Sequence, residues 1–400
     1  MEFKLKKDSI IYAITALFTA LVYSYKDAVW VNEKYAMYFE RGDTSSPIFL
    51  LLIHSALLIV FIVGVKKICK NKKNFLYGFL FFLTISFYFA KSFLEDGVYS
   101  ALTSPTTPIV YLLSLAFFVG MDDKIWNAVR KCLPVLIVAY ICLLIYSYMS
   151  LLNRYGAVVV GNSSLIFYYV ALFWCSIIYL IDRIIRKEDI GLFQQLLIAF
   201  NIVFAVIINS RSWILQSCLV AIVIYLFGTM KHNIKTKIFR LSLLLITGLL
   251  VLQLLDNYFS TYLTFLSNKL GSDSRSHQYI EMASASSFWG WMFGNGAKAV
   301  YYDSAQGFIA NIDNQYIFIA FHYGVIVLLQ WLAPQVMALV SIVKNRNIRL
   351  IAALPIICWF MALGGLSIFN GVYCDIKHLM IMLYMGHVMS LNNNGGYADE

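Results

Sequence analysis

Apolar runs of about 17 to 21 residues recur along nearly the whole chain, with short charged segments between them. At 1.5 Å per residue, each run is long enough to cross a hydrocarbon core of ~30 Å as a helix. Hydrophobic residues make up 60% of the 400 residues and charged residues 13%. Soluble domains are about 45–50% apolar and about 25% charged. The sequence therefore predicts an all-α, polytopic membrane protein and excludes a soluble globular fold.

We predict about twelve membrane spans, which form a single transmembrane domain over residues 1–400. They cover residues 9–25, 47–65, 75–94, 105–121, 133–152, 165–181, 192–209, 212–229, 240–256, 313–343, 350–369 and 374–391. No small-residue cleavage site follows the first span, so we expect it to remain in the mature chain. The tenth span is too long for one crossing and is expected either to project outward at Asp313-Asn314 or to bend at Pro334. The tail 392–400 is predicted to be disordered.

Lys and Arg lie mostly on one side of the predicted spans. With the N-terminus in the cytoplasm, 21 of the 31 Lys and Arg residues fall in cytoplasmic segments. The positive-inside rule then places both termini in the cytoplasm and the large loop 257–312, between the ninth and tenth spans, outside. This topology accounts for the net charge of +10. A nucleic-acid partner is not expected, because the charges form no basic-aromatic surface.

The loop 257–312 is the only long amphiphilic segment of the chain. We expect short interfacial helices in it, one of them capped by Ser272-Asp273-Ser274 and continuing through Phe288. Gly294-Asn295-Gly296 is predicted to be a tight turn. Trp289 and Trp291 suit an interfacial aromatic belt or, alternatively, a platform on which sugar rings stack. Other polar and aromatic residues of this loop are His277, Tyr301 and Tyr302.

Three charged residues are candidates for chemistry at the outer face. Arg211 lies between two closely spaced spans, where it either anchors a hairpin at the interface or clamps a phosphate through its bidentate guanidinium. Arg275 either pairs with nearby carboxylates or serves the same clamp. Asp313 is a candidate general base, and Asn314 either caps the next helix or joins the site.

Neither a metal site nor a cofactor is predicted from the sequence. No two histidines or carboxylates have metal-ligand spacing. The seven cysteines contain no C-x-x-C pair, so a disulfide framework is not expected. His322 is expected to pack inside the tenth span, and His378, next to Lys377, to end the last outside loop.

The second half of the chain resembles the bacterial O-antigen polymerase (Wzy) family and, more distantly, the related O-antigen ligases. The resemblance is one of layout. It is carried by Ser210-Arg211-Ser212 opening a span, by the long loop with Arg275, Phe288-Trp289-Gly290-Trp291 and Gly294-Asn295-Gly296, and by Asp313-Asn314-Gln315-Tyr316 opening the next span.

This resemblance implies a metal-independent C-type glycosyltransferase at the outer, periplasmic face of the bacterial inner membrane. It would join undecaprenyl-pyrophosphate-linked oligosaccharide repeat units into O-antigen or a related surface polysaccharide. Arg211 and Arg275 would hold the pyrophosphate leaving group, which gains charge in the transition state. Trp289, Trp291, Asn314, Tyr316 and His277 would bind the substrate. A chain-length regulator and a flippase are the implied protein partners, besides the membrane lipids.

Two alternatives remain open. Asp313 stands where ligases usually carry a histidine, which favours a polymerase over a ligase and leaves the identity of the general base open. A polysaccharide-unit flippase also has about twelve spans, but it would place ionisable residues in the middle of the membrane and have short outside loops. The concentration of polar residues in one long loop favours the enzyme.

Overall fold

The computed structural model describes residues 62–65, 68–69, 72–103, 108–155, 165–208, 210–227, 242, 275–304, 307–309, 314–344, 350–366 and 375–393. The first predicted span and nearly all of the second and ninth lie outside the described residues, as do 394–400 of the predicted tail. Helix α16 (Asp375–Asn393) extends over the first two residues of that tail.

The described part of the chain is mostly helical, as predicted, and its helices follow the apolar runs. In chain order the other elements are α3 (Lys72–Thr103), η1 (Pro108–Leu115), α4 (Ala116–Gly120), α5 (Asp123–Tyr155), α7 (Leu165–Ile185), α8 (Leu192–Ile207), α9 (Arg211–Phe227), α12 (Arg275–Ala285), α13 (Phe288–Phe293), β1 (Tyr301–Asp303), β2 (Gly307–Ile309), α14 (Gln315–Lys344), η2 (Leu350–Ala353), α15 (Leu354–Met361) and η3 (Ala362–Leu366). Among these described elements, four helices contain segments long and apolar enough to cross a membrane: Asn74–Glu95, Asp123–Met149, Tyr168–Ile185 and Gln315–Lys344. Shorter apolar helices accompany them. The architecture is therefore consistent with a multi-pass membrane protein.

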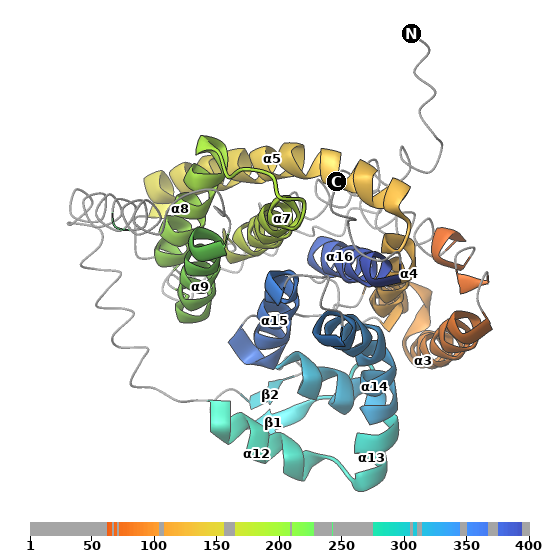
Figure 1. Ribbon diagram of the computed structural model, residues 1–400. Helices are drawn as coiled ribbons and strands as arrows, with labels where there is room; N and C mark the ends of the chain where they lie inside the picture. Colours follow the sequence, from red (N-terminus) through yellow and green to blue (C-terminus); the bar gives the residue numbers. More distant parts are fainter. Residues whose placement is uncertain are drawn as a thin grey trace.

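Helix α7 is the central helix of the bundle. Its apolar window Tyr168–Ile185 is 94% buried inside the protein, against 28% for the windows in α3 and α5. Figure 1 shows α7 and α16 inside the bundle, α5 along one side, and α12, α13 and the two strands beyond α14 on the opposite side. Large buried aromatics fill the interior: Trp126, Trp174, Trp213, Trp331 and Trp359. The outward faces of α3 and α5 are apolar and exposed, as expected for helices that meet lipid.

Helix α14 is broken at Gly324, a position that neither expectation for the tenth span named. Within α14, which the structure describes throughout, Gly324 has non-helical angles (φ 89°, ψ 160°), whereas the helix continues through Pro334. Proline removes one backbone donor, which leaves the carbonyl four residues earlier without its helical partner. The hydroxyl of Tyr77 in α3 donates to that carbonyl, at Gln330, over 2.6 Å. The neighbouring helix thus replaces the bond that is missing at Pro334.

The break turns the first half of α14 across the bundle. In one straight helix, Gln315 and Trp331 would lie about 24 Å apart along the axis. Tyr111 of η1 nevertheless contacts both: its hydroxyl accepts from Gln315 Nε2 at 2.9 Å, and its ring lies 6.0 Å from that of Trp331. Tyr111 also meets Tyr323 edge-on at 5.7 Å. The start of α14 therefore does not project outward from the bundle.

Candidate functional site

The described part of the large loop folds into α12, α13 and a β-hairpin. Short helices were predicted, but α12 ends at Ala285 and not at Phe288, and the hairpin was not predicted. Strands β1 and β2 pair antiparallel, with Tyr302 opposite Phe308. Helix α12 holds the hairpin, because Glu281 Oε2 accepts from the Ser304 amide at 3.0 Å and Met282 is buried beneath it. The proposed cap Ser272-Asp273-Ser274 lies outside the described residues.

Ser287 starts α13, since its hydroxyl accepts from the Gly290 amide at 3.1 Å. The chain then makes the predicted turn at Gly294-Asn295-Gly296, where both glycines have positive φ. This turn docks on the break in α14. The amides of Asn295 and Gly296 donate to the carbonyls of Phe321 and His322, at 2.9 and 3.0 Å. These carbonyls end the first half of α14, so the turn provides partners that a continuous helix would have supplied internally.

His322 completes this junction. It is fully buried, and its Nδ1 lies 2.9 Å from the Gly296 carbonyl oxygen, so this nitrogen donates. The Tyr88 hydroxyl of α3 donates to the Phe293 carbonyl. The prediction that His322 packs inside the tenth span is confirmed, with the addition that it fixes the loop to α14.

Asn314 caps the first half of α14. Its Oδ1 accepts from the amides of Tyr316 and Ile317, at 3.0 and 3.2 Å, and its Nδ2 donates to the Gly364 carbonyl of η3 at 3.4 Å. The Tyr316 hydroxyl donates to the Phe360 carbonyl at 3.0 Å. Of the two alternatives for Asn314, the helix cap is thus observed. Asn314 and Tyr316 join α14 to α15 and η3, and both are only partly buried.

Gln315, between these two residues, is a polar group that the sequence analysis did not single out. It is 1% exposed, and its Oε1 has no hydrogen-bond partner among the described residues. A buried amide oxygen without a partner is costly unless water or a ligand reaches it. Its position next to predicted site residues is the signal that could have found it.

Arg211 is the first residue of α9, and Arg275 is the first described residue of α12, which also contains His277. The side chains of all three, and the whole of Asp313, lie outside the described residues. A cation at the positive end of a helix is electrostatically unfavourable, because the helix dipole favours anions there. Arg211, at the start of α9, is therefore placed where a bound anion would relieve repulsion.

The two tryptophans of the loop differ in environment. Trp289 is 67% exposed and stacks on Phe293 with ring centroids 5.9 Å apart. Trp291 is half-buried and meets Phe321 of α14 edge-on at 6.0 Å. Trp291 therefore helps to dock α13, whereas Trp289 presents its ring to the surroundings.

A second buried group lies at the start of α16. Lys377 is 1% exposed and His378 is fully buried. His378 Nε2 accepts from Trp331 Nε1 at 3.0 Å and lies 3.2 Å from Ser114 Oγ. The assignment of this pair to an outside loop is therefore wrong, because it belongs to the packed interior of the bundle. An ionisable pair inside an apolar run was the signal for it.

The opposite end of the bundle contains a buried ionic cluster centred on Asp182 in α7, which the sequence analysis also missed. Asp182 is 0% exposed. Its Oδ2 lies 2.6 Å from Arg130 Nε and 3.2 Å from Arg186 Nε, and its Oδ1 accepts from Trp126 Nε1 at 2.9 Å. Arg130 also pairs with Glu188. The cluster ties α7 to α5, and His387 of α16 lies beside it, stacked on Trp126 at 4.7 Å.

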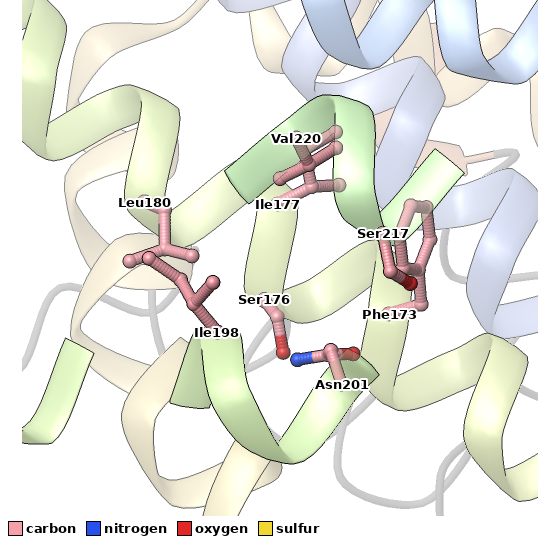
Figure 2. A pocket seen from close by; sticks show the side chains of 8 residues that line it. All are labelled: Phe173, Ser176, Ile177, Leu180, Ile198, Asn201, Ser217 and Val220. Atoms are coloured by element: carbon pink, nitrogen blue, oxygen red, sulfur yellow. The ribbon is translucent and has the colours of Figure 1, made fainter. Parts of the chain in front are cut away.

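One small cavity lies between α7, α8 and α9, and Figure 2 shows its lining. It has room for about one water molecule. Asn201 and Ser176 point toward each other across it, while Ser217 contributes a second hydroxyl. Asn201 Oδ1 has no hydrogen-bond partner among the described residues. The cavity suits one bound water and is too small for a sugar.

Comparison with family models, with curated proteins and with solved structures found no match for the chain.

Proposed function

We propose that the protein is a glycosyltransferase that polymerises undecaprenyl-pyrophosphate-linked oligosaccharide repeat units at the periplasmic face of the bacterial inner membrane. The observation that carries the proposal is the junction between the loop and α14. The loop is docked on the break at Gly324, and the same break turns the start of α14, with Asn314, into the bundle. A lipid-linked sugar has its pyrophosphate at the membrane surface, so its enzyme needs a polar site built at that level.

Arg211 and Arg275 are proposed to bind the pyrophosphate. Arg211 is the first residue of α9, so its guanidinium and the dipole of that helix would act on the same anion. The pyrophosphate gains charge as the glycosidic bond to it breaks, and a fixed cation stabilises that charge most in the transition state. Asp313, the residue before the capping Asn314, is proposed to take the proton from the acceptor hydroxyl.

A flippase is the second candidate, and specific observations favour it. Helices α3 and α14 are both broken, at Gly97 and Gly324, and the Lys377–His378 pair is buried in the bundle. Broken helices and buried ionisable groups are typical of transporters. Membranes supplied with lipid-linked repeat units separate the two functions, because a polymerase makes a ladder of products and a flippase makes none. A ligase would transfer the glycan to a different lipid acceptor without forming a ladder.

The arginines provide the direct test. Lysine keeps the charge but loses the planar fork, so Arg211→Lys and Arg275→Lys are each expected to reduce polymerisation about 100-fold at unchanged abundance in the membrane. Arg183→Lys is the matched control, because Arg183 lies at the opposite end of the bundle beside Glu188. It should leave the ladder unchanged. Wild-type ladders from both Arg211→Lys and Arg275→Lys would contradict the proposed clamp.

A further inference from the structure

The outward surface of α13 is unusually apolar for a segment predicted to lie outside the membrane. Phe288, Trp289 and Phe293 are 69, 67 and 52% exposed. Their rings form one cluster, because Trp289 lies 5.3 Å from Phe288 and 5.9 Å from Phe293. Three large aromatic rings in water would be costly, at about 25 cal/mol per Å² of apolar surface.

Helix α3 gives the level of α13 relative to the bilayer. The apolar span in α3 ends at Glu95 on the loop side. Tyr88, which binds the Phe293 carbonyl, lies seven residues inside that end, about 10 Å deeper at 1.5 Å per residue. Lys91 and Glu95, an ion pair at 3.9 Å, lie between Tyr88 and the end of the span, and both are partly exposed. The turn after α13 reaches this charged pair, since a Cβ atom at Gly296 would lie 3.8 Å from Lys91 Nζ and 4.0 Å from Glu95 Oε2. The C-terminal end of α13, bound at Tyr88, therefore lies within about one helical turn of the charged end of α3.

Helix α14 gives independent evidence for the depth of α13 in the bundle. The turn after α13 binds the carbonyls of Phe321 and His322 at the break. The first half of α14 does not rise above this level, because Tyr111 binds Gln315 while contacting Trp331 in the second half. The break, and α13 with it, thus lies at a depth that the bundle itself occupies.

The polar backbone of the segment permits such a depth. Non-helical backbone is tolerated inside a membrane only where protein groups satisfy it. From Phe293 to Gly296, five backbone groups are bonded within the protein: the Phe293 carbonyl to Tyr88, the Gly294 amide to the Gly290 carbonyl, the Asn295 and Gly296 amides to α14, and the Gly296 carbonyl to His322.

We infer that α13 is a re-entrant element that inserts into the loop-side leaflet, with Phe288, Trp289 and Phe293 in contact with lipid acyl chains. The aromatic cluster then continues the lipid-facing surface of α3, where Phe87 and Leu94 are 65 and 82% exposed. A buried depth of about 5–10 Å is usual for amphipathic segments of this kind. The inference does not depend on the reaction that the protein catalyses.

Trp289 makes the depth measurable. The full-length protein and its Trp289→Phe variant are reconstituted in phosphatidylcholine vesicles with brominated or with plain acyl chains. In each kind of vesicle, the emission of the full-length protein minus that of the variant gives the Trp289 contribution. We expect bromolipid to quench most of this contribution and aqueous iodide to leave it nearly unchanged. Phenylalanine keeps the aromatic contact with Phe293, so folding should be retained.

Trp213→Phe is the matched control, because Trp213 is fully buried inside the protein and should respond to neither quencher. A second reporter places tryptophan at Phe293 in the Trp289→Phe background, and it should be quenched by bromolipid as well. Quenching of the Trp289 contribution by iodide and not by bromolipid would overturn the inference, as would a contribution that neither quencher reaches.

Discussion

Replacing Asp182 with asparagine is expected to destabilise the protein by about 3 to 5 kcal/mol. The carboxylate is the shared partner of Arg130 and Arg186, and it is 0% exposed. The amide keeps the shape and can still accept from Trp126, but it removes the buried charge that Arg130 and Arg186 share, and Arg130 keeps its pair with Glu188. The measurement is the free energy of unfolding of the purified protein in mixed detergent micelles.

Glu188→Gln is the matched control for Asp182→Asn. It removes the same charge from the same cluster, but the Glu188 side chain is 29% exposed, so water can solvate Arg130 and Arg183 when the carboxylate is lost. We expect a loss of at most about 1 kcal/mol. Equal losses from the two substitutions would show that burial does not determine the strength of this cluster.

The Asp182 cluster illustrates what the sequence did not reveal. Apolar run length predicted α7, α8 and α9 closely, because helices that cross a bilayer must be long and apolar. The same reasoning assigned Arg130 and Arg186 to cytoplasmic loops as topology signals. Asp182 and Arg186 have the i,i+4 spacing of a helix pair, which the sequence does show. The contact of Arg130 with Asp182 is set by how α5 packs on α7, which depends on contacts between distant parts of the chain and leaves no local pattern.

At the candidate site, too, the sequence predicted a local turn but not its contacts with distant parts of the chain. The turn at Gly294-Asn295-Gly296 was predicted from its composition, but its docking partner on α14 was not. Glycine is common in membrane helices, so Gly324 within an apolar run did not indicate a break, and the bend was expected at Pro334. In both cases a side chain or turn from elsewhere decides the outcome: Tyr77 supports the helix at Pro334, and the loop binds the open carbonyls before Gly324.

Gly324→Ala is expected to undock α13 from α14 and to destabilise the protein by about 3 to 5 kcal/mol. Two effects add at this position. Gly324 has φ 89° and ψ 160°, a region that only glycine adopts readily. A Cβ atom there would also stand well inside van der Waals contact with the Met292 carbonyl oxygen, and a backbone atom held by the docked turn cannot easily move away.

Two other glycines separate these effects. Gly97 in α3 has a similar backbone conformation (φ 78°, ψ 164°), but an added Cβ would meet no atom of the described residues within 4 Å. Gly97→Ala should therefore show the conformational effect alone, about 1 to 3 kcal/mol. At Gly364 the Cβ would meet only Tyr316 Cε2, at 3.9 Å, an ordinary contact. Gly364→Ala should change stability by less than about 0.5 kcal/mol.

The undocking itself is read out by proteolysis of the segment 286–304. If the turn and α14 hold each other as described, Gly324→Ala exposes this segment to cleavage while Gly97→Ala leaves it protected, since only the first substitution pushes on Met292. The loss of stability should then be largest at Gly324, where backbone strain and atomic overlap add. It should be smaller at Gly97, where only strain acts, and smallest at Gly364, where neither acts. Equal losses at Gly324 and Gly97, with the loop still protected, would mean that the close approach of Met292 to α14 contributes nothing and that α13 is held by its other contacts.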